Sequence, residues 1–249
     1  CKGVEGVRCG RCGISSAIPL KLQPYRLADH VLFKDRHGVE GVVEEWRRTG
    51  LQRFAYLFGS IVPRSIDDDC DLGIAINVEH IYQPTSQHCA TDGVQLLEAC
   101  TDELQVAKQV ATHLNLELVG CMYTDLSDDG TRTGKVVPRD HIVSAAELCF
   151  MSHQQQASGR RFVTCIIAGS KDGDIEPAAY MASDLLVSLC KHHLVAPSTD
   201  PDLLVSKKCE FLYTKKNEYG FEVPVRAKAG DSVPVDYFIV SLSHGFDSV

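Results

Sequence analysis

Apolar residues recur along this chain with two periods, and each period predicts a different kind of element. Over 97–114 they fall three or four positions apart, which is the pattern of a helix with one buried stripe. A shorter helix is predicted over 42–48, ended by Gly50. A third helix is predicted over 178–189, entered through Pro177, because proline is tolerated in the first turn of a helix.

Other apolar runs are rich in aromatic and β-branched residues, and these runs predict strands. Five of them occur, over 53–62, 72–82, 116–124, 162–169 and 235–242. The polar stretches predict an acidic turn at 67–71, a loop over 125–139, and a hairpin or an insertion within 197–230. The order strand, strand, helix, strand predicts a mixed α/β fold in which helices flank a central sheet.

The composition is that of a globular protein with an acidic balance. The chain has 249 residues, of which 44% are hydrophobic and 23% charged, and this is enough for a full core. A net charge of −8 argues against non-specific binding to nucleic acid or anionic lipid. The longest apolar runs, such as 163–168, are too short to cross a bilayer. We therefore predict no nucleic-acid partner and no direct insertion into a membrane.

The Gly-rich first segment contains a candidate metal site. Cys9 and Cys12 form a Cys-x-x-Cys pair, and Cys1 lies eight residues upstream. Such a pair can hold one tetrahedral zinc ion with a structural role, and the fourth ligand would precede Cys1 or be His30 or His37. A redox dithiol and unliganded cysteines are the alternatives. Because the chain begins at Cys1 rather than methionine, we expect it to be part of a longer protein.

The remaining cysteines and histidines carry no recognisable catalytic pattern. The cysteine count is eleven, and an odd number without the spacing of a disulfide framework favours a reducing compartment, the cytosol or the nucleus. The chain lacks His-x-His, His-x-x-x-His, Gly-x-Ser-x-Gly and the phosphate-binding glycine motifs. Asp125, Asp128 and Asp129 form a carboxylate cluster in an acidic loop, where solvation is the ordinary state and metal binding the alternative. We predict neither catalytic nor cofactor-binding residues.

Two of the predicted strands resemble those of an MPN domain, the scaffold of zinc-dependent deubiquitinases. The matching strings are 53–60 (RFAYLFGS) and 119–125 (VGCMYTD). In the enzymes the first strand ends in a glutamate and the second carries His-x-His. By this resemblance Ser60, Tyr123 and Asp125 replace those ligands, and Ser144 and Glu147 fall at the serine and aspartate of the same site. The resemblance thus implies an MPN-like sheet that recognises rather than cleaves.

Further strings, in order along the chain, resemble the nuclear protein localization protein 4 family. They are 17–26 (AIPLKLQPYR), 28–33 (ADHVLF), 46–50 (WRRTG), 72–74 (LGI), 81–84 (IYQP), 162–164 (FVT) and 234–240 (PVDYFIV). The resemblance implies the end of a zinc-finger segment over 1–30 and an inactive MPN domain with insertions over 31–249. It also places Cys1, Cys9 and Cys12 at zinc-finger cysteines.

The same resemblance implies a non-enzymatic adaptor. Members of this family pair with ubiquitin fusion degradation protein 1 and deliver polyubiquitinated proteins to the AAA+ ATPase valosin-containing protein (cell division control protein 48). There the substrates are unfolded for proteasomal and ER-associated degradation. One ubiquitin is expected to lie unfolded in a groove on the MPN surface. The expected location is the cytoplasm and nucleus, and partly the ER membrane through partners.

Two other classes of function remain open at the level of sequence. The chain could be a structural, inactive MPN subunit of a larger complex, in which case a preceding zinc segment is not expected. It could also be a metal-dependent deubiquitinase with unusual ligands, which cleavage of di-ubiquitin would reveal.

Overall fold

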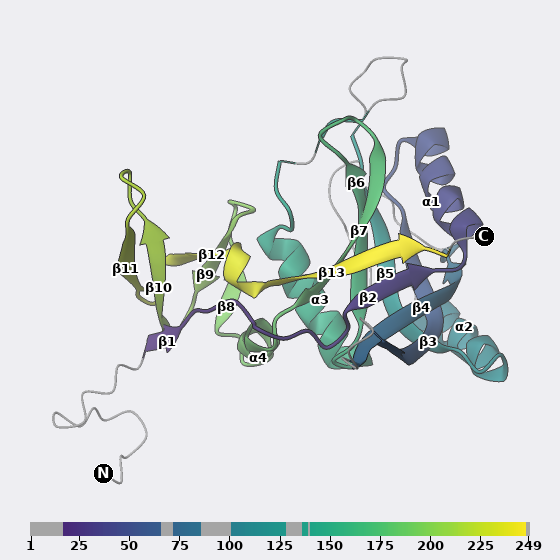
Figure 1. Cartoon of the computed structure of the whole chain (residues 1–249), viewed down its shortest axis with the longest axis horizontal. Helices are drawn as coiled ribbons and strands as arrows, with labels where there is room; N and C mark the ends of the chain where they lie inside the picture. Colours follow the sequence, from purple (N-terminus) through teal and green to yellow (C-terminus); the bar gives the residue numbers. More distant parts are fainter. Residues whose placement is uncertain (1–16, 66–71, 86–100, 128–135, 139, 248–249) are drawn as a thin grey trace, which may run out of the picture.

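A seven-stranded sheet that closes into a barrel is the largest part of the molecule (Figure 1). The computed structural model of the chain describes residues 17–65, 72–85, 101–127, 136–138 and 140–247. In order around the barrel, the strands are β13 (Ile239–Phe246), β2 (His30–Phe33), β4 (Leu72–Tyr82), β3 (Phe54–Ser65), β5 (Glu117–Asp125), β6 (Val163–Gly169) and β7 (Ile175–Ala182). Together with the helices beside it, this sheet confirms the predicted mixed α/β fold.

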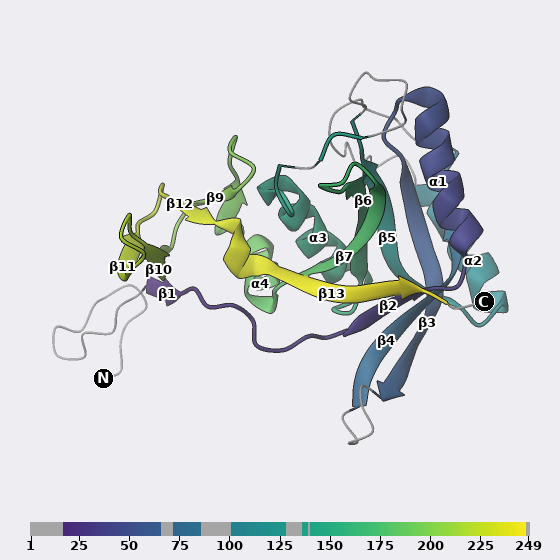
Figure 2. The same cartoon turned by 45° about the horizontal axis from the view of Figure 1, so that its top comes forward.

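Four α-helices occur in the described ranges; the first three contact strands of the barrel sheet, and the last packs against the third (Figures 1 and 2). They are α1 (Arg36–Thr49), α2 (Thr101–His113), α3 (Ala145–Ser158) and α4 (Asp184–Lys191). Side chains alternate along a strand, so neighbouring residues of β5 enter different cores. Met122 is buried in the core that includes Trp46 of α1, and Tyr123 in the core that includes Leu148 of α3. Among the described residues, no helix is both long and apolar enough to span a bilayer.

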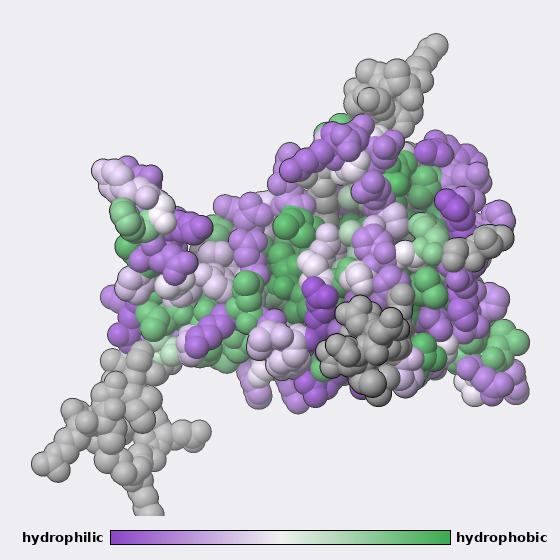
Figure 3. Space-filling view, in the orientation of Figure 1, coloured by the Kyte–Doolittle hydropathy of each residue, from purple (hydrophilic) through white to green (hydrophobic). Residues whose placement is uncertain are grey.

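Two small three-stranded sheets form the other end of the molecule (Figure 1). One has the order β1 (Ala17–Pro19), β10 (Glu210–Lys216) and β11 (Glu222–Ala227), and the other β12 (Ser232–Pro234), β9 (Leu203–Ser206) and β8 (Val195–Pro197). The strands β10 and β11 are antiparallel, which confirms a hairpin within 197–230. On the face drawn in Figure 3, hydrophobic side chains reach the surface between this end and the barrel.

Helix α1 ends where the sequence predicts but begins earlier. Gly50 has a left-handed φ of 68°, and its N–H donates to the Trp46 carbonyl at 2.7 Å, which is the expected glycine cap. The helix begins at Arg36 rather than Val42, because the Asp35 carboxylate accepts the Gly38 N–H at 2.7 Å and caps the N-terminus.

The helix predicted over 178–189 is wrong in its first half. Residues up to Ala182 belong to β7, which pairs with β6 on one edge and with β13 on the other. Helix α4 begins only after Ser183, whose hydroxyl accepts the Leu186 N–H at 3.3 Å. A strand that lies between two other strands can have a continuous run of apolar residues instead of alternating apolar and polar ones. The spacing of its apolar residues then fits a helix as well as a strand, which is why the sequence prediction failed here.

Two other predictions need correction. The strand predicted over 235–242 starts as a 3-10 helix, Val235–Phe238, and becomes extended only in β13. The helical stripe predicted over 97–114 is buried at Ala111, but α2 ends at His113, and Leu114 beyond it is 56% exposed. The acidic turn at 67–71 and the start of the predicted helix, 97–100, lie outside the described residues.

Strands β3 and β4 approach each other closely at Gly59, and this predicts the effect of a substitution there. A Cβ added at Gly59 would stand 1.8 Å from the Asn77 carbonyl oxygen, at a shift in the strand register. We expect Gly59→Ala to lower the free energy of unfolding by about 2–4 kcal/mol or to prevent folding, because backbone blocks the added methyl. Chemical denaturation measures the effect.

Gly41 in α1 provides the matched control. Within the described ranges, a Cβ at Gly41 would meet no atom within 4 Å. Gly41→Ala should therefore raise the free energy of unfolding by about 0.5–1 kcal/mol through helix propensity. Equal effects of the two substitutions would contradict the close approach at Gly59.

Candidate functional site

The structure brings together three of the residues that the MPN resemblance assigns to one site. Tyr123 extends from β5 into the core below α3, and its hydroxyl donates to Oε1 of Glu147 at 2.8 Å. Ser144 caps α3, and its backbone N–H donates to Oε2 of Glu147 at 2.7 Å. The Ser144 hydroxyl in turn accepts the Glu147 N–H at 3.3 Å. Tyr123, Glu147 and Ser144 thus form one hydrogen-bonded group at the N-terminal end of α3, which we call the Tyr123 cluster.

This cluster joins β5 to α3 rather than exposing reactive groups. Glu147 is 8% exposed and Tyr123 is 1% exposed. The Nε2 atom of His141 lies 3.9 Å from the second carboxyl oxygen of Glu147. A tyrosine hydroxyl donates a hydrogen bond to the carboxyl group, whereas the histidines of a hydrolase would bind a metal ion through their ring nitrogens. The geometry is that of a capping box extended by a buried tyrosine.

Ser60 does not belong to this cluster, so that part of the expectation is wrong. In the antiparallel pair of β3 and β5, Tyr123 lies opposite Phe54, and Ser60 is six positions further along β3. At the rise of a strand this is about 20 Å. The Ser60 hydroxyl instead donates to Glu79 at 3.0 Å. Asp125 lies two residues beyond Tyr123 on β5, half-buried and opposite Ala168 of β6.

The predicted zinc ligands Cys1, Cys9 and Cys12 lie outside the described residues. Two histidines considered as a fourth ligand have partners in the folded domain. Nδ1 of His30 lies 2.8 Å from the Ser243 hydroxyl, and Nδ1 of His37 lies 3.3 Å from a Glu40 oxygen. In the part of the chain that the structure describes, no three His, Cys, Asp or Glu side chains are grouped to hold a metal ion. The thiol chemistry of the Cys-x-x-Cys pair still suits zinc.

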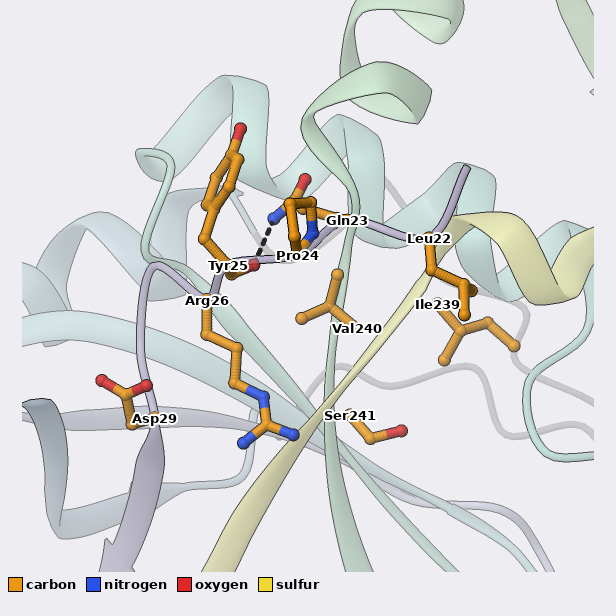
Figure 4. A pocket seen from close by; sticks show the side chains of 9 residues that line it. All are labelled: Leu22, Gln23, Pro24, Tyr25, Arg26, Asp29, Ile239, Val240 and Ser241. Atoms are coloured by element: carbon orange, nitrogen blue, oxygen red, sulfur yellow. Dashed lines mark hydrogen bonds between the residues drawn. The ribbon is translucent and has the colours of Figure 1, made fainter. Parts of the chain in front are cut away.

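An open groove of about 570 Å³ lies between the start of β13 and the connection from β1 to β2 (Figure 4). We call residues 22–29 of this connection the strap. The groove is lined by Leu22, Gln23, Pro24, Tyr25, Arg26, Asp29, Ile239, Val240 and Ser241. It combines apolar side chains with the guanidinium of Arg26 and the hydroxyl of Ser241. Sequence reasoning did not find this groove, since its two walls are more than 200 residues apart.

The β13 wall of the groove is a strand edge. Residues 239–242 of β13 pair with β7, and residues 243–246 pair with β2 on the opposite edge. In the described structure no strand pairs with the first half of β13 on that opposite edge, where the strap runs instead. Such an edge presents backbone N–H and C=O groups that an added strand could use.

The strap is held to α4 by hydrogen bonds to one aspartate. The Tyr25 hydroxyl donates to the Asp184 carboxylate at 2.7 Å, and Arg160 binds the same oxygen at 2.6 Å. The Asp184 N–H donates to the Gln23 side chain at 2.8 Å. The hydrogen bond to Asp184 is the main reason why the pKa of Tyr25 is raised. These contacts hold the strap wall of the groove to α4.

The buried tyrosine makes a testable contribution to stability. Tyr123→Phe removes the donor to Glu147 and should lower the free energy of unfolding by about 1–3 kcal/mol, because one carboxyl oxygen loses a buried partner. Urea denaturation of the two proteins measures the difference.

The matched control is Tyr219→Phe. Tyr219 is 79% exposed, so the loss of its hydroxyl should change stability by less than about 0.5 kcal/mol. If the two substitutions had the same small effect, the hydrogen bond to Glu147 would not stabilise the α3 cluster.

Comparison with known proteins assigns the chain to a family. The model described as "NPL4 family" matches residues 53–249, and the one described as "NPL4 family, putative zinc binding region" matches 4–50. Proteins called nuclear protein localization protein 4 match 96% of the chain. That of Meyerozyma guilliermondii is 35% identical over 261 residues, with 45% of its length covered. That of Saccharomyces cerevisiae is 33% identical over 262 residues, with 44% covered. The chain, which spans less than half the length of these relatives, therefore belongs to the NPL4 family.

Proposed function

We propose that this chain is part of a non-enzymatic substrate adaptor that binds ubiquitin. With ubiquitin fusion degradation protein 1, it would bring polyubiquitinated proteins to an AAA+ ATPase of the valosin-containing protein type. The ATPase would unfold them for proteasomal and ER-associated degradation. The observation that carries the proposal is the match of the NPL4 family model to residues 53–249. The proposed location is the cytoplasm and nucleus, and partly the ER membrane through partners.

The groove beside β13 supports the binding of an extended polypeptide. Its β13 wall is an unpaired strand edge in the described structure, and its strap wall carries Leu22, which is 64% exposed. An extended segment can add to such an edge through its backbone while alternate side chains enter the groove. Over the strap and the start of β13, hydrophobic and hydrophilic surface lie side by side (Figure 3). We therefore assign the unfolded ubiquitin segment to this groove.

The Tyr123 cluster supports the absence of hydrolytic activity. At the positions that the resemblance assigns to a catalytic site, Tyr123 and Glu147 bind each other, and the backbone of Ser144 binds the second carboxyl oxygen. These contacts give both carboxyl oxygens a structural role. We propose that the site holds α3 on the sheet and does no chemistry.

A structural zinc ion is part of the proposal. The family model over 4–50 supports a zinc-binding region that includes Cys9 and Cys12. These two residues and Cys1, which precedes the matched range, are the proposed ligands. Zinc bound by four side chains has no open position for water, so it would order the segment without catalysing a reaction. This segment is the proposed docking element for the ATPase.

The groove assignment predicts the effect of one substitution. Leu22→Asp places a charge at the groove and should weaken binding of polyubiquitin at least about tenfold, which corresponds to roughly 1.4 kcal/mol. Leu114→Asp is the matched control, because Leu114 is similarly exposed but lies on the connection after α2. Isothermal titration with polyubiquitin, for the chain alone and in its complex with the ATPase, measures both.

These measurements test the binding of ubiquitin in the groove separately from the adaptor function. If the two substitutions weakened binding equally, the assignment of ubiquitin to the groove would be contradicted, whereas the adaptor function would not. No heat with either polyubiquitin or the ATPase at concentrations well above micromolar would contradict the adaptor and favour a structural subunit. Cleavage of di-ubiquitin that stops with a chelator would overturn the non-enzymatic assignment.

A further inference from the structure

Two cysteines face each other where α3 packs against α4. Cys149 lies in α3 and Cys190 at the end of α4, and their sulfur atoms are 3.9 Å apart. Both are buried, with 7% and 5% of their surfaces exposed. A disulfide needs a sulfur separation of about 2 Å, so the two atoms have to approach by only about 2 Å. The contact is between residues 41 positions apart, so packing rather than local sequence creates it.

The surroundings of this pair favour one thiolate. The neighbouring Cys149 and, to a smaller extent, Ser152 lower the pKa of Cys190, against the opposing effect of burial. The hydrogen bond to Cys190, with burial, raises the pKa of Cys149. Ser152 is fully buried, and within the described structure its hydroxyl has no hydrogen-bond partner of ordinary geometry. A thiolate at Cys190 would therefore accept a hydrogen bond from the Ser152 hydroxyl.

Two other buried cysteines differ from Cys190 in the direction of their pKa shift. Burial raises the pKa of Cys121 to about 12, and its sulfur lies 3.7 Å from the Thr164 hydroxyl. Burial also raises the pKa of Cys165 on the adjacent strand β6. A thiol that stays protonated reacts slowly with oxidants, because the thiolate is the nucleophile. Cys121 and Cys165 therefore serve as internal references.

We propose that Cys149 and Cys190 are a redox modification site, which a hydroperoxide converts into a disulfide between α3 and α4. The Cys190 thiolate attacks one peroxide oxygen, the O–O bond breaks, and the other oxygen leaves and is protonated. This gives a sulfenic acid at Cys190. The Cys149 sulfur then attacks the Cys190 sulfur, the S–O bond breaks, and water leaves with the Cys149 proton. Two electrons pass from two thiols to one peroxide, and a dithiol reductant reverses the change.

The position of Cys190 provides a route for the oxidant. Helix α4 has only eight residues, and the exposed His192 and His193 follow Cys190 almost directly. His193 has a left-handed φ of 53°, which ends the helix sharply. Helix ends open locally at a lower free energy than the whole domain, so Cys190 can become accessible without global unfolding.

The disulfide would have a defined structural effect. Helix α4 begins at Asp184, which binds Tyr25 of the strap. A covalent bond between Cys190 and α3 would therefore fix the helix that anchors the strap. It would also close a loop of chain between α3 and α4, which restricts the unfolded state. This inference does not depend on the proposed binding of ubiquitin.

The experiment uses the reduced chain and graded doses of hydrogen peroxide. After each dose the protein is denatured and alkylated, and its peptides are mapped by mass spectrometry without reduction. We expect a peptide pair linked through Cys149 and Cys190 at doses that leave Cys121 and Cys165 open to alkylation. Dithiothreitol should restore both thiols, and the oxidised chain should melt roughly 5 °C higher.

Two cysteine-to-serine variants test whether the link requires Cys190. Cys190→Ser should abolish the link and leave Cys149 open to alkylation, whereas the matched control Cys165→Ser should retain the link. The proposal is overturned if Cys149 and Cys190 stay reduced until Cys121 and Cys165 are oxidised. It is equally overturned if they are oxidised without being joined to each other. The peptide map of the unmodified chain decides this even if a variant fails to fold.

Discussion

Strand β13 changes partners half-way along its length, and the rest of the molecule depends on this exchange. Its first half pairs with β7 and its second half with β2, so one strand closes the barrel with a different neighbour on each edge. The closure brings His30 into contact with Ser243, 213 residues later in the chain. A closed barrel leaves few unpaired strand edges. The open first half of β13 is therefore the natural place for an added strand.

The strap turns that open edge into a groove. Just before the strap, the Leu20 N–H donates to the Leu212 carbonyl, and the end of the strap is held by Asp29, which bonds to β4 and β13. Between these points Asp184, the first residue of α4, accepts a hydrogen bond from Tyr25 and so ties the strap to α4. The same helix contacts α3 through Cys149 and Cys190. Helix α4 thus both anchors the strap and carries one cysteine of the proposed redox site.

The Tyr123 cluster lies at positions that the MPN resemblance assigns to a catalytic site, and here it serves packing. By that resemblance, the positions in a hydrolase would bring ring nitrogens and a carboxylate to a common metal ion. Here the hydroxyl of Tyr123 reaches the carboxyl group of Glu147 directly, and the first turn of α3 supplies its second partner. A buried carboxyl group without such partners would be costly. The contacts therefore stabilise the junction of β5 and α3.

The sequence alone determined the features that depend on neighbouring residues. The strand over 72–82 and the end of α1 at Gly50 follow from local spacing and turn chemistry. For 197–230 the sequence left a hairpin and an insertion as alternatives, and the structure contains the hairpin. The family resemblance also came from local strings, and the family match confirms it. The zinc ligands Cys1, Cys9 and Cys12 remain a prediction from spacing.

Only the tertiary structure decided the features that depend on strand register and on distant partners. Ser60 is separated from Tyr123 because β3 and β5 pair antiparallel, with a shift in register that no local pattern records. Residues 178–182 form a strand because β6 and β13 flank them. The groove and the Cys149–Cys190 contact join segments that are distant in the chain. Spacing along a chain specifies which side chains share a face, whereas packing specifies which faces meet.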